Sequence, residues 1–116
     1  ADAVPATADK AQSAALELDD ATFAAQTAQG VVLVDFWAPW CPPCRMQGPI
    51  VDAVAKQLGS TAKVAKVNVD NAKATPQAFG VRSIPTLVVL KDGKIVKSFT
   101  GLTQADALVA AVKDAL

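Results

Sequence analysis

The chain has 116 residues, the size of one domain, and 52% of them are hydrophobic, enough for a core without crosslinks. The 11 Lys and Arg residues balance the 11 Asp and Glu residues, which argues against nucleic acid or an anionic membrane surface as a partner. No apolar run approaches the roughly 20 residues that span a bilayer, and the absence of histidine excludes a histidine base or a histidine-ligated metal.

The N-terminal residues 1–15, ADAVPATADKAQSAA, carry no apolar stripe, and we expect them to form a flexible tail. They also lack a basic start and an apolar stretch, so we expect no uncleaved signal peptide. The alternative is the remnant of an export or transit sequence that is cut just before Ala1. Residues 16–116 are expected to form the single domain.

Strand and helix patterns alternate from residue 16 onward. The segment LEL (16–18) is a strand candidate, and Asp19 or Asp20 can cap a helix that ends at Gly30. The run VVLVDF (31–36) is typical of a buried central strand. After the cysteines, apolar residues recur every four positions and predict one face of a helix: Met46, Ile50, Val54 and Leu58.

The second half of the chain contains three further predicted strands, at residues 63–69, 84–90 and 94–100. Asp92-Gly93 stands between the last two and indicates a tight antiparallel hairpin. A short helix can start at Thr75 and end at Gly80. The last helix is expected to begin at Thr103 with a near capping box. Its apolar stripe consists of Ala105, Leu108, Val109, Val112 and Leu116.

These predictions give the order β-α-β-α-β-α-β-β-α. Strands that alternate with helices pair in parallel, whereas the final hairpin adds an antiparallel pair. We therefore expect an α/β fold, with a central mixed five-stranded sheet and helices on both of its faces.

The only two cysteines stand in the stretch WCPPCR (40–45), and three interpretations compete. Structural zinc needs about four ligands, so a metal site here would need carboxylates or a second copy of the chain. A structural crosslink would close a loop of a few residues and remove little entropy from the unfolded chain. Catalytic thiol–disulfide exchange is favoured, because the pair follows a strand and a short aromatic loop and stands at the start of a helix.

In this interpretation Cys41 is the nucleophile. Its thiolate would face free backbone N–H groups at the positive end of a helix, which lowers the pKa of the thiol. Cys44 lies one turn further in, so we expect it to be more buried, to keep its proton and to act second as the resolving thiol. Cys41 would attack a substrate disulfide, and Cys44 would then attack the mixed disulfide.

Pro42 and Pro43 have no backbone N–H, so hydrogen bonds to the Cys41 thiolate must come chiefly from Cys44. The fixed φ angles restrict the loop in both redox states. We therefore expect a moderately depressed Cys41 pKa and a reducing couple.

With these residues assembled, the chain from about Leu16 to Leu116 closely resembles the thioredoxin family. The block VDFWAPWCPPCR looks like the active-site block, and AKVNVD, VRSIPTLVVLKDG and TGLTQADAL resemble the other blocks in the same order. The resemblance implies the thioredoxin fold over residues 16–116 and protein disulfide reductase activity through Cys41 and Cys44. It also implies no bound cofactor, and electrons supplied by thioredoxin reductase or an equivalent protein.

The resemblance further implies roles for residues around the cysteines. Asp35 matches a buried carboxylate whose pKa burial would raise and which would accept the Cys44 proton through water. Lys66 matches the lysine that pairs with this carboxylate. A capped or edge-exposed Asp35 and an ordinary strand-edge Lys66 are the alternatives. Trp37 matches a partly buried aromatic beside the site, with plain core packing as its alternative, and Pro49 matches the proline that kinks the helix.

Pro85 matches the cis-proline that faces the cysteines, whereas the residues alone would favour a strand-edge proline. A cis bond there would leave the backbone of Ile84 free to pair with an extended substrate. The active-site loop would consist of Trp40, Pro42 and Pro43. The substrate would lie on a flat apolar surface formed by Trp40, Ile84, Pro85, Gly101 and Leu102.

Pro42 stands where the family usually has glycine, so the redox potential and the reductase partner are the properties that this chain could change. An exported or organelle-dedicated carrier with few targets is the alternative within the same chemistry. A non-enzymatic binding module is the alternative of a different class. We expect a monomer in the cytoplasm, or in the periplasm or an organelle if a targeting sequence has been removed.

Overall fold

A computed structural model describes residues 15–116 of the chain. These residues form five strands and four helices: β1 Ala15–Leu18, α2 Phe23–Thr27, β2 Val31–Trp37, α3 Pro42–Leu58, β3 Lys63–Asn68, α4 Ala74–Ala78, β4 Thr86–Lys91, β5 Lys94–Thr100 and α5 Ala105–Ala115. The predicted order of elements is confirmed. The tail expected at residues 1–15 lies outside the described residues, apart from Ala15, which is the first residue of β1.

The strands form one mixed sheet in the order β1-β3-β2-β4-β5, with β1 and β5 at its edges. Strands β1, β3 and β2 run parallel, while β4 pairs antiparallel with both β2 and β5. The β4–β5 hairpin turns through Asp92 and Gly93, both with positive φ, as a tight hairpin requires. The α/β class and the mixed five-stranded sheet predicted from the sequence are therefore confirmed.

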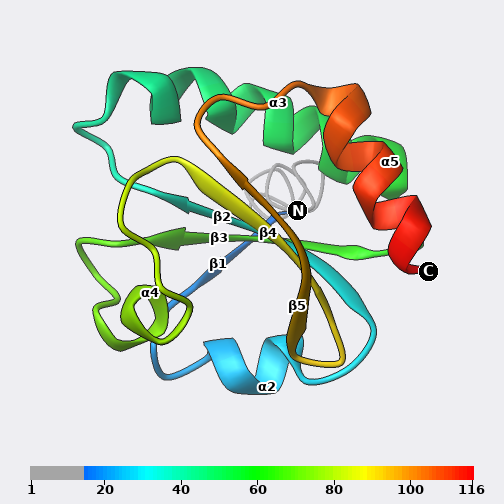
Figure 1. The fold of residues 1–116 in the computed structure, drawn as a ribbon, viewed down its shortest axis with the longest axis horizontal. Helices are drawn as coiled ribbons and strands as arrows, with labels where there is room; N and C mark the ends of the chain where they lie inside the picture. Colours follow the sequence, from blue (N-terminus) through cyan, green and yellow to red (C-terminus); the bar gives the residue numbers. More distant parts are fainter. Residues whose placement is uncertain (1–14) are drawn as a thin grey trace, which may run out of the picture.

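Helices cover both faces of this sheet (Figure 1). Helices α3 and α5 lie on one face, and the short helices α2 and α4 lie on the other. The first face carries a core of Leu33, Val64 and Leu87 from the strands with Val51 and Leu108 from the helices. The second face carries three phenylalanine rings packed together: Phe23, Phe36 and Phe79. Because both faces are buried, β2 is apolar almost throughout.

The buried face of α3 differs from the predicted one in its first two turns. Met46 is 60% exposed, and the residues that enter the core are Cys44, Gln47, Val51, Val54, Ala55 and Leu58. A strict spacing of four drifts by about 40° per step around a helix with 3.6 residues per turn, so Met46 and Leu58 cannot share one face. Pro49 lies on the exposed side of the continuous helix.

Two of the predicted helix caps also differ from those in the structure. Asp19 holds the turn before α2, where its carboxylate accepts hydrogen bonds from the N–H groups of Ala21 and Thr22. Asp20 instead caps α4, more than 50 residues away: its carboxylate accepts from the N–H groups of residues 73–75. Among the described residues no side chain caps α5, so the capping box predicted at Thr103 is wrong.

Candidate active site

The two cysteines meet where the chain leaves β2 and enters α3. Cys41 is the N-cap residue of α3, and Pro42 and Pro43 take its first two positions. Prolines suit these positions because N–H groups there have no partner within a helix. The N–H of Cys44 donates to Sγ of Cys41 over 3.3 Å, as expected from the lack of donors on the prolines.

Cys41 and Cys44 form a disulfide in this structure. Their exposed fractions are 4% and 2%, so the expected difference in burial is small in the oxidised state. The two residues pack with buried Ala38 and with the half-buried side chains of Trp37 and Ile84. Trp37 therefore lies beside the cysteine pair.

The segment before β4 faces the cysteines. The peptide bond between Ile84 and Pro85 is cis, and the carbonyl oxygen of Ile84 lies 3.8 Å from Sγ of Cys41. The carbonyl oxygen of Pro85 accepts a hydrogen bond of 2.8 Å from the N–H of Gly101. Gly101 has a φ of +91°, a region that favours glycine, so a side chain here would strain the contact.

The exposed part of the expected apolar surface comes from Trp40 and Leu102. Trp40 is 63% exposed, and its indole N–H donates to the carboxylate of Asp70 over 3.0 and 3.2 Å. Ile84 is half-buried. Pro85 is buried, because it directly precedes a strand whose residues are buried through Leu90, so its expected place on the surface is wrong.

Asp35 is a carboxylate in the middle of the buried strand β2. It is 1% exposed, and its Oδ1 atom has no hydrogen-bond partner among the described residues. Burial raises the pKa of Asp35 to about 7. The positive charge of Lys66 opposes this rise, and the negative charges of Glu17 and Asp52 add to it. The alternative of an edge-exposed Asp35 is therefore excluded.

Lys66 lies opposite Asp35 in the register of β2 and β3. Among the described residues its ion pair is with Asp52 of α3, where Nζ and Oδ1 are 2.8 Å apart. The expected direct pairing of Lys66 with Asp35 is therefore wrong, because α3 packs over this face of the sheet and brings a more exposed carboxylate to the ammonium group. The Lys66 charge still lowers the pKa of Asp35 from a distance.

Comparisons with known proteins point to one family. A family model described as Thioredoxin matches residues 14–114. A thioredoxin from Bacillus subtilis is 44% identical over 95 residues, which cover 82% of this chain and 91% of the relative. Thioredoxin 1 from Synechococcus elongatus is 47% identical over 91 residues, covering 77% of this chain and 85% of the relative.

The chain belongs to the thioredoxin family. A solved structure of a mutant thioredoxin from Halobacterium salinarum superposes with a TM-score of 0.80 at 37% identity, covering 90% of this chain and 92% of the other. The thioredoxin fold is therefore confirmed, and with it thiol–disulfide oxidoreductase activity as a protein-disulfide reductase.

Thioredoxins act through a redox-active disulfide without a cofactor, on disulfide-containing substrates and with a reductase as electron donor. Within residues 15–116, no group of three or more Cys, Asp and Glu side chains gathers as a metal site would require. No helix in the same part of the chain is long and apolar enough to cross a membrane.

Two polar residues that form contacts near this thioredoxin site were missed in the sequence. Asp70 holds the Trp40 indole from the loop after β3. Gln47 is fully buried in α3 and makes two hydrogen bonds to the backbone of Thr103. No local sequence pattern indicates the role of either residue, because the partner of each is at least 30 positions away.

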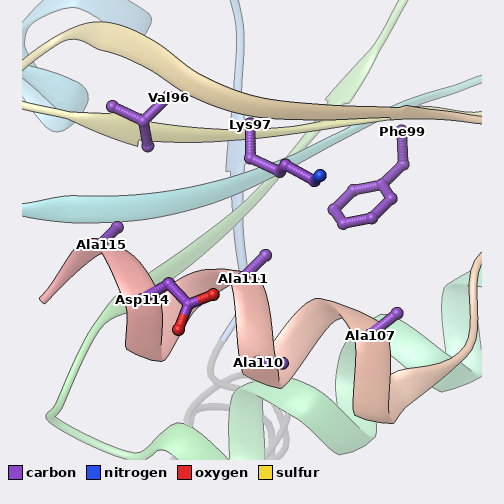
Figure 2. Close-up of a pocket in the computed structure, with 8 residues that line it drawn as sticks. All are labelled: Val96, Lys97, Phe99, Ala107, Ala110, Ala111, Asp114 and Ala115. Atoms are coloured by element: carbon purple, nitrogen blue, oxygen red, sulfur yellow. The ribbon is translucent and has the colours of Figure 1, made fainter.

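One hollow of the described surface lies away from the thioredoxin disulfide. It is a cavity of about 440 Å³ between the edge strand β5 and helix α5. Figure 2 shows the alanines of α5 along one side, with Lys97 and Phe99 of β5 on the other. Its lining contains no cysteine and none of the predicted site residues, so this cavity is not where the disulfide reacts.

Proposed function

We propose that Cys41 is the attacking thiol and Cys44 the resolving thiol of this protein-disulfide reductase. The observation that carries the proposal is the position of Cys41 at the N-cap of α3, with its sulfur accepting the N–H of Cys44 over 3.3 Å. A helix N-terminus and a backbone donor both stabilise a thiolate and lower the pKa of its thiol.

Two exchanges complete the reaction. The Cys41 thiolate attacks one substrate sulfur, forms a mixed disulfide and releases the other substrate sulfur as a thiolate. The Cys44 thiolate then attacks the Cys41 sulfur, which forms the Cys41–Cys44 disulfide and releases the second substrate thiolate. The substrate gains two electrons and the protein loses two.

Asp35 is proposed to take the proton of Cys44 before the second exchange, through water. Its buried carboxyl group has a pKa raised to about 7, so it can accept and return a proton near neutral pH. Lys66 is proposed to tune this group through its charge.

The substrate is proposed to lie across Trp40 and Leu102, with an extended segment beside the backbone of Ile84. The carbonyl oxygen of Ile84 lies within 3.8 Å of the reacting sulfur, which suits pairing in the manner of an added strand. Gly101 supports this surface through its bond to Pro85.

A protein reductase, thioredoxin reductase or an equivalent, is proposed to return the electrons to a monomeric protein. The cytoplasm, where thiols are kept reduced, suits this role. The expected domain, residues 16–116, carries all of these groups.

A trapping experiment tests the two cysteine roles. Cys44→Ser should accumulate a mixed disulfide between Cys41 and insulin, because the second exchange cannot occur. Cys41→Ser, the matched control, should trap none. Equal trapping by both variants, or trapping by Cys41→Ser alone, would overturn the assignment.

A further inference from the structure

Gln47 is a fully buried amide on the face of α3 that otherwise enters the core with apolar side chains. It lies one helical turn after Cys44. Its Nε2 donates to the carbonyl oxygen of Thr103 over 2.9 Å, and its Oε1 accepts from the N–H of Thr103 over 2.8 Å. The nitrogen and the oxygen of the Gln47 amide thus both form hydrogen bonds to the backbone of one residue.

Thr103 belongs to the connection between β5 and α5. The same connection is attached on its other side, where the N–H of Gly101 donates to the carbonyl oxygen of Pro85. Thr103 Oγ1 donates to the carbonyl oxygen of Gly101 over 2.9 Å and closes the turn between the two anchors. Leu102, the exposed residue between them, is therefore fixed relative to both α3 and the segment before β4.

We infer that Gln47 is a positioning residue for substrate binding: it holds the segment Gly101–Thr103 against the active-site helix. The inference rests on the proposed function, in which Leu102 contacts protein substrates. Without the amide, the N–H and carbonyl groups of Thr103 lose their buried partners and the segment must move to find water.

This role predicts different effects on protein substrates and on small disulfides. A protein disulfide that lies across Leu102 depends on the position of the segment, because a surface that must be ordered on binding costs affinity. A small disulfide needs only access to Cys41. Loss of the Gln47 bonds should therefore weaken binding of protein disulfides and leave the thiol chemistry unchanged.

Gln47→Met tests the inference, because methionine is similar in length and forms neither hydrogen bond. The reduced protein is mixed with increasing insulin, and separately with the small aromatic disulfide dithiobisnitrobenzoate. We expect the half-saturating insulin concentration to rise about tenfold, with the maximal rate and the small-disulfide rate within about twofold of wild type. The Thr103 amide should also exchange its hydrogen faster.

Val54→Ala is the matched control, since Val54 is buried in the same helix two turns further on. An equal rise in half-saturation for Val54→Ala would mean general loss of stability and overturn the inference. A half-saturating insulin concentration that stays unchanged in Gln47→Met would also overturn it. So would an equal loss of rate with insulin and with the small disulfide.

Gln47→Glu keeps the inference testable if Gln47→Met does not fold. If burial keeps its carboxyl group protonated, it can donate to the carbonyl oxygen of Thr103 and accept from the N–H, whereas the ionised carboxylate at alkaline pH cannot donate. The half-saturating insulin concentration of this variant, relative to wild type at the same pH, should therefore rise from neutral to alkaline pH, and an unchanged ratio refutes the role. Failure of wild type to reduce insulin faster than dithiothreitol alone would instead contradict the proposed function, whatever the variants do.

Discussion

Replacing Asp35 by asparagine should make the protein more stable at alkaline pH. The pKa of Asp35 rises from 3.8 to about 7 in the folded protein, chiefly because burial disfavours the charged carboxylate. Between these two values the folded protein holds a proton that the unfolded chain has released. The free energy of unfolding therefore falls as pH rises through this window, and the full loss is present above pH 7.

The interval between 3.8 and about 7 corresponds to about 4 kcal/mol of destabilisation. Asparagine cannot ionise, so the variant lacks this pH dependence. Its amide carries a constant cost, because the Oδ1 position has no hydrogen-bond partner among the described residues. The pH dependence of the difference in unfolding free energy between the two proteins therefore measures the effect of the Asp35 charge alone.

Urea unfolding of the oxidised wild type and Asp35→Asn, at intervals from pH 4 to pH 9, measures this change. The difference in unfolding free energy should move by about 4 kcal/mol in favour of the variant across the range. A difference that stays constant with pH would refute the burial argument. Asp35→Asn should also slow reduction of insulin near neutral pH, and an unchanged rate would remove Asp35 from the proton transfer.

Three further predictions follow from individual contacts. Lys66→Met should raise the pKa of Asp35 further above its ordinary value, because the charge that lowers it is removed; a carboxyl NMR titration that shows a fall would contradict this. Pro42→Gly should lower the pKa of Cys41, since glycine restores a backbone donor, and thiolate absorbance that reports a higher pKa would contradict the donor argument. Asp20→Ala should lower the thermal midpoint at neutral pH by uncapping α4. The stabilisation by Asp20 should be lost as pH falls from 3.8 through about 2, whereas an equal effect of the substitution at pH 7 and below pH 2 would show that the carboxylate charge is irrelevant.

Local signals in the sequence predicted most of the fold correctly. The hairpin at Asp92-Gly93 needs two consecutive residues with positive φ, and few dipeptides other than Asp-Gly provide them. The position of Cys41 at the start of α3 followed from the strand and the short aromatic loop before it, and the two prolines take the first positions of the helix. Such features depend on neighbours in the chain and are visible in a short window.

Contacts between distant segments could not be predicted in this way. Asp20 appeared to be a cap for the helix beside it, but tertiary packing places the N-terminus of α4 within its reach. Lys66 pairs with Asp52 because α3 crosses above β3, which no spacing in the sequence encodes. Gln47 was missed as well, since its partner Thr103 is distant in sequence and a polar residue in a helix is ordinarily expected to face water.

The position of β5 at the edge of the sheet bears on how this protein behaves at high concentration. An edge strand has a row of unpaired backbone groups to which a strand of another molecule can bind. Here Lys94 and Lys97 place charge along the edge, and an irregularity in the pairing at Val89 and Leu90 distorts the neighbouring register. Both features oppose the addition of a foreign strand, so this edge of the sheet should resist aggregation while the disulfide opens and closes through repeated cycles.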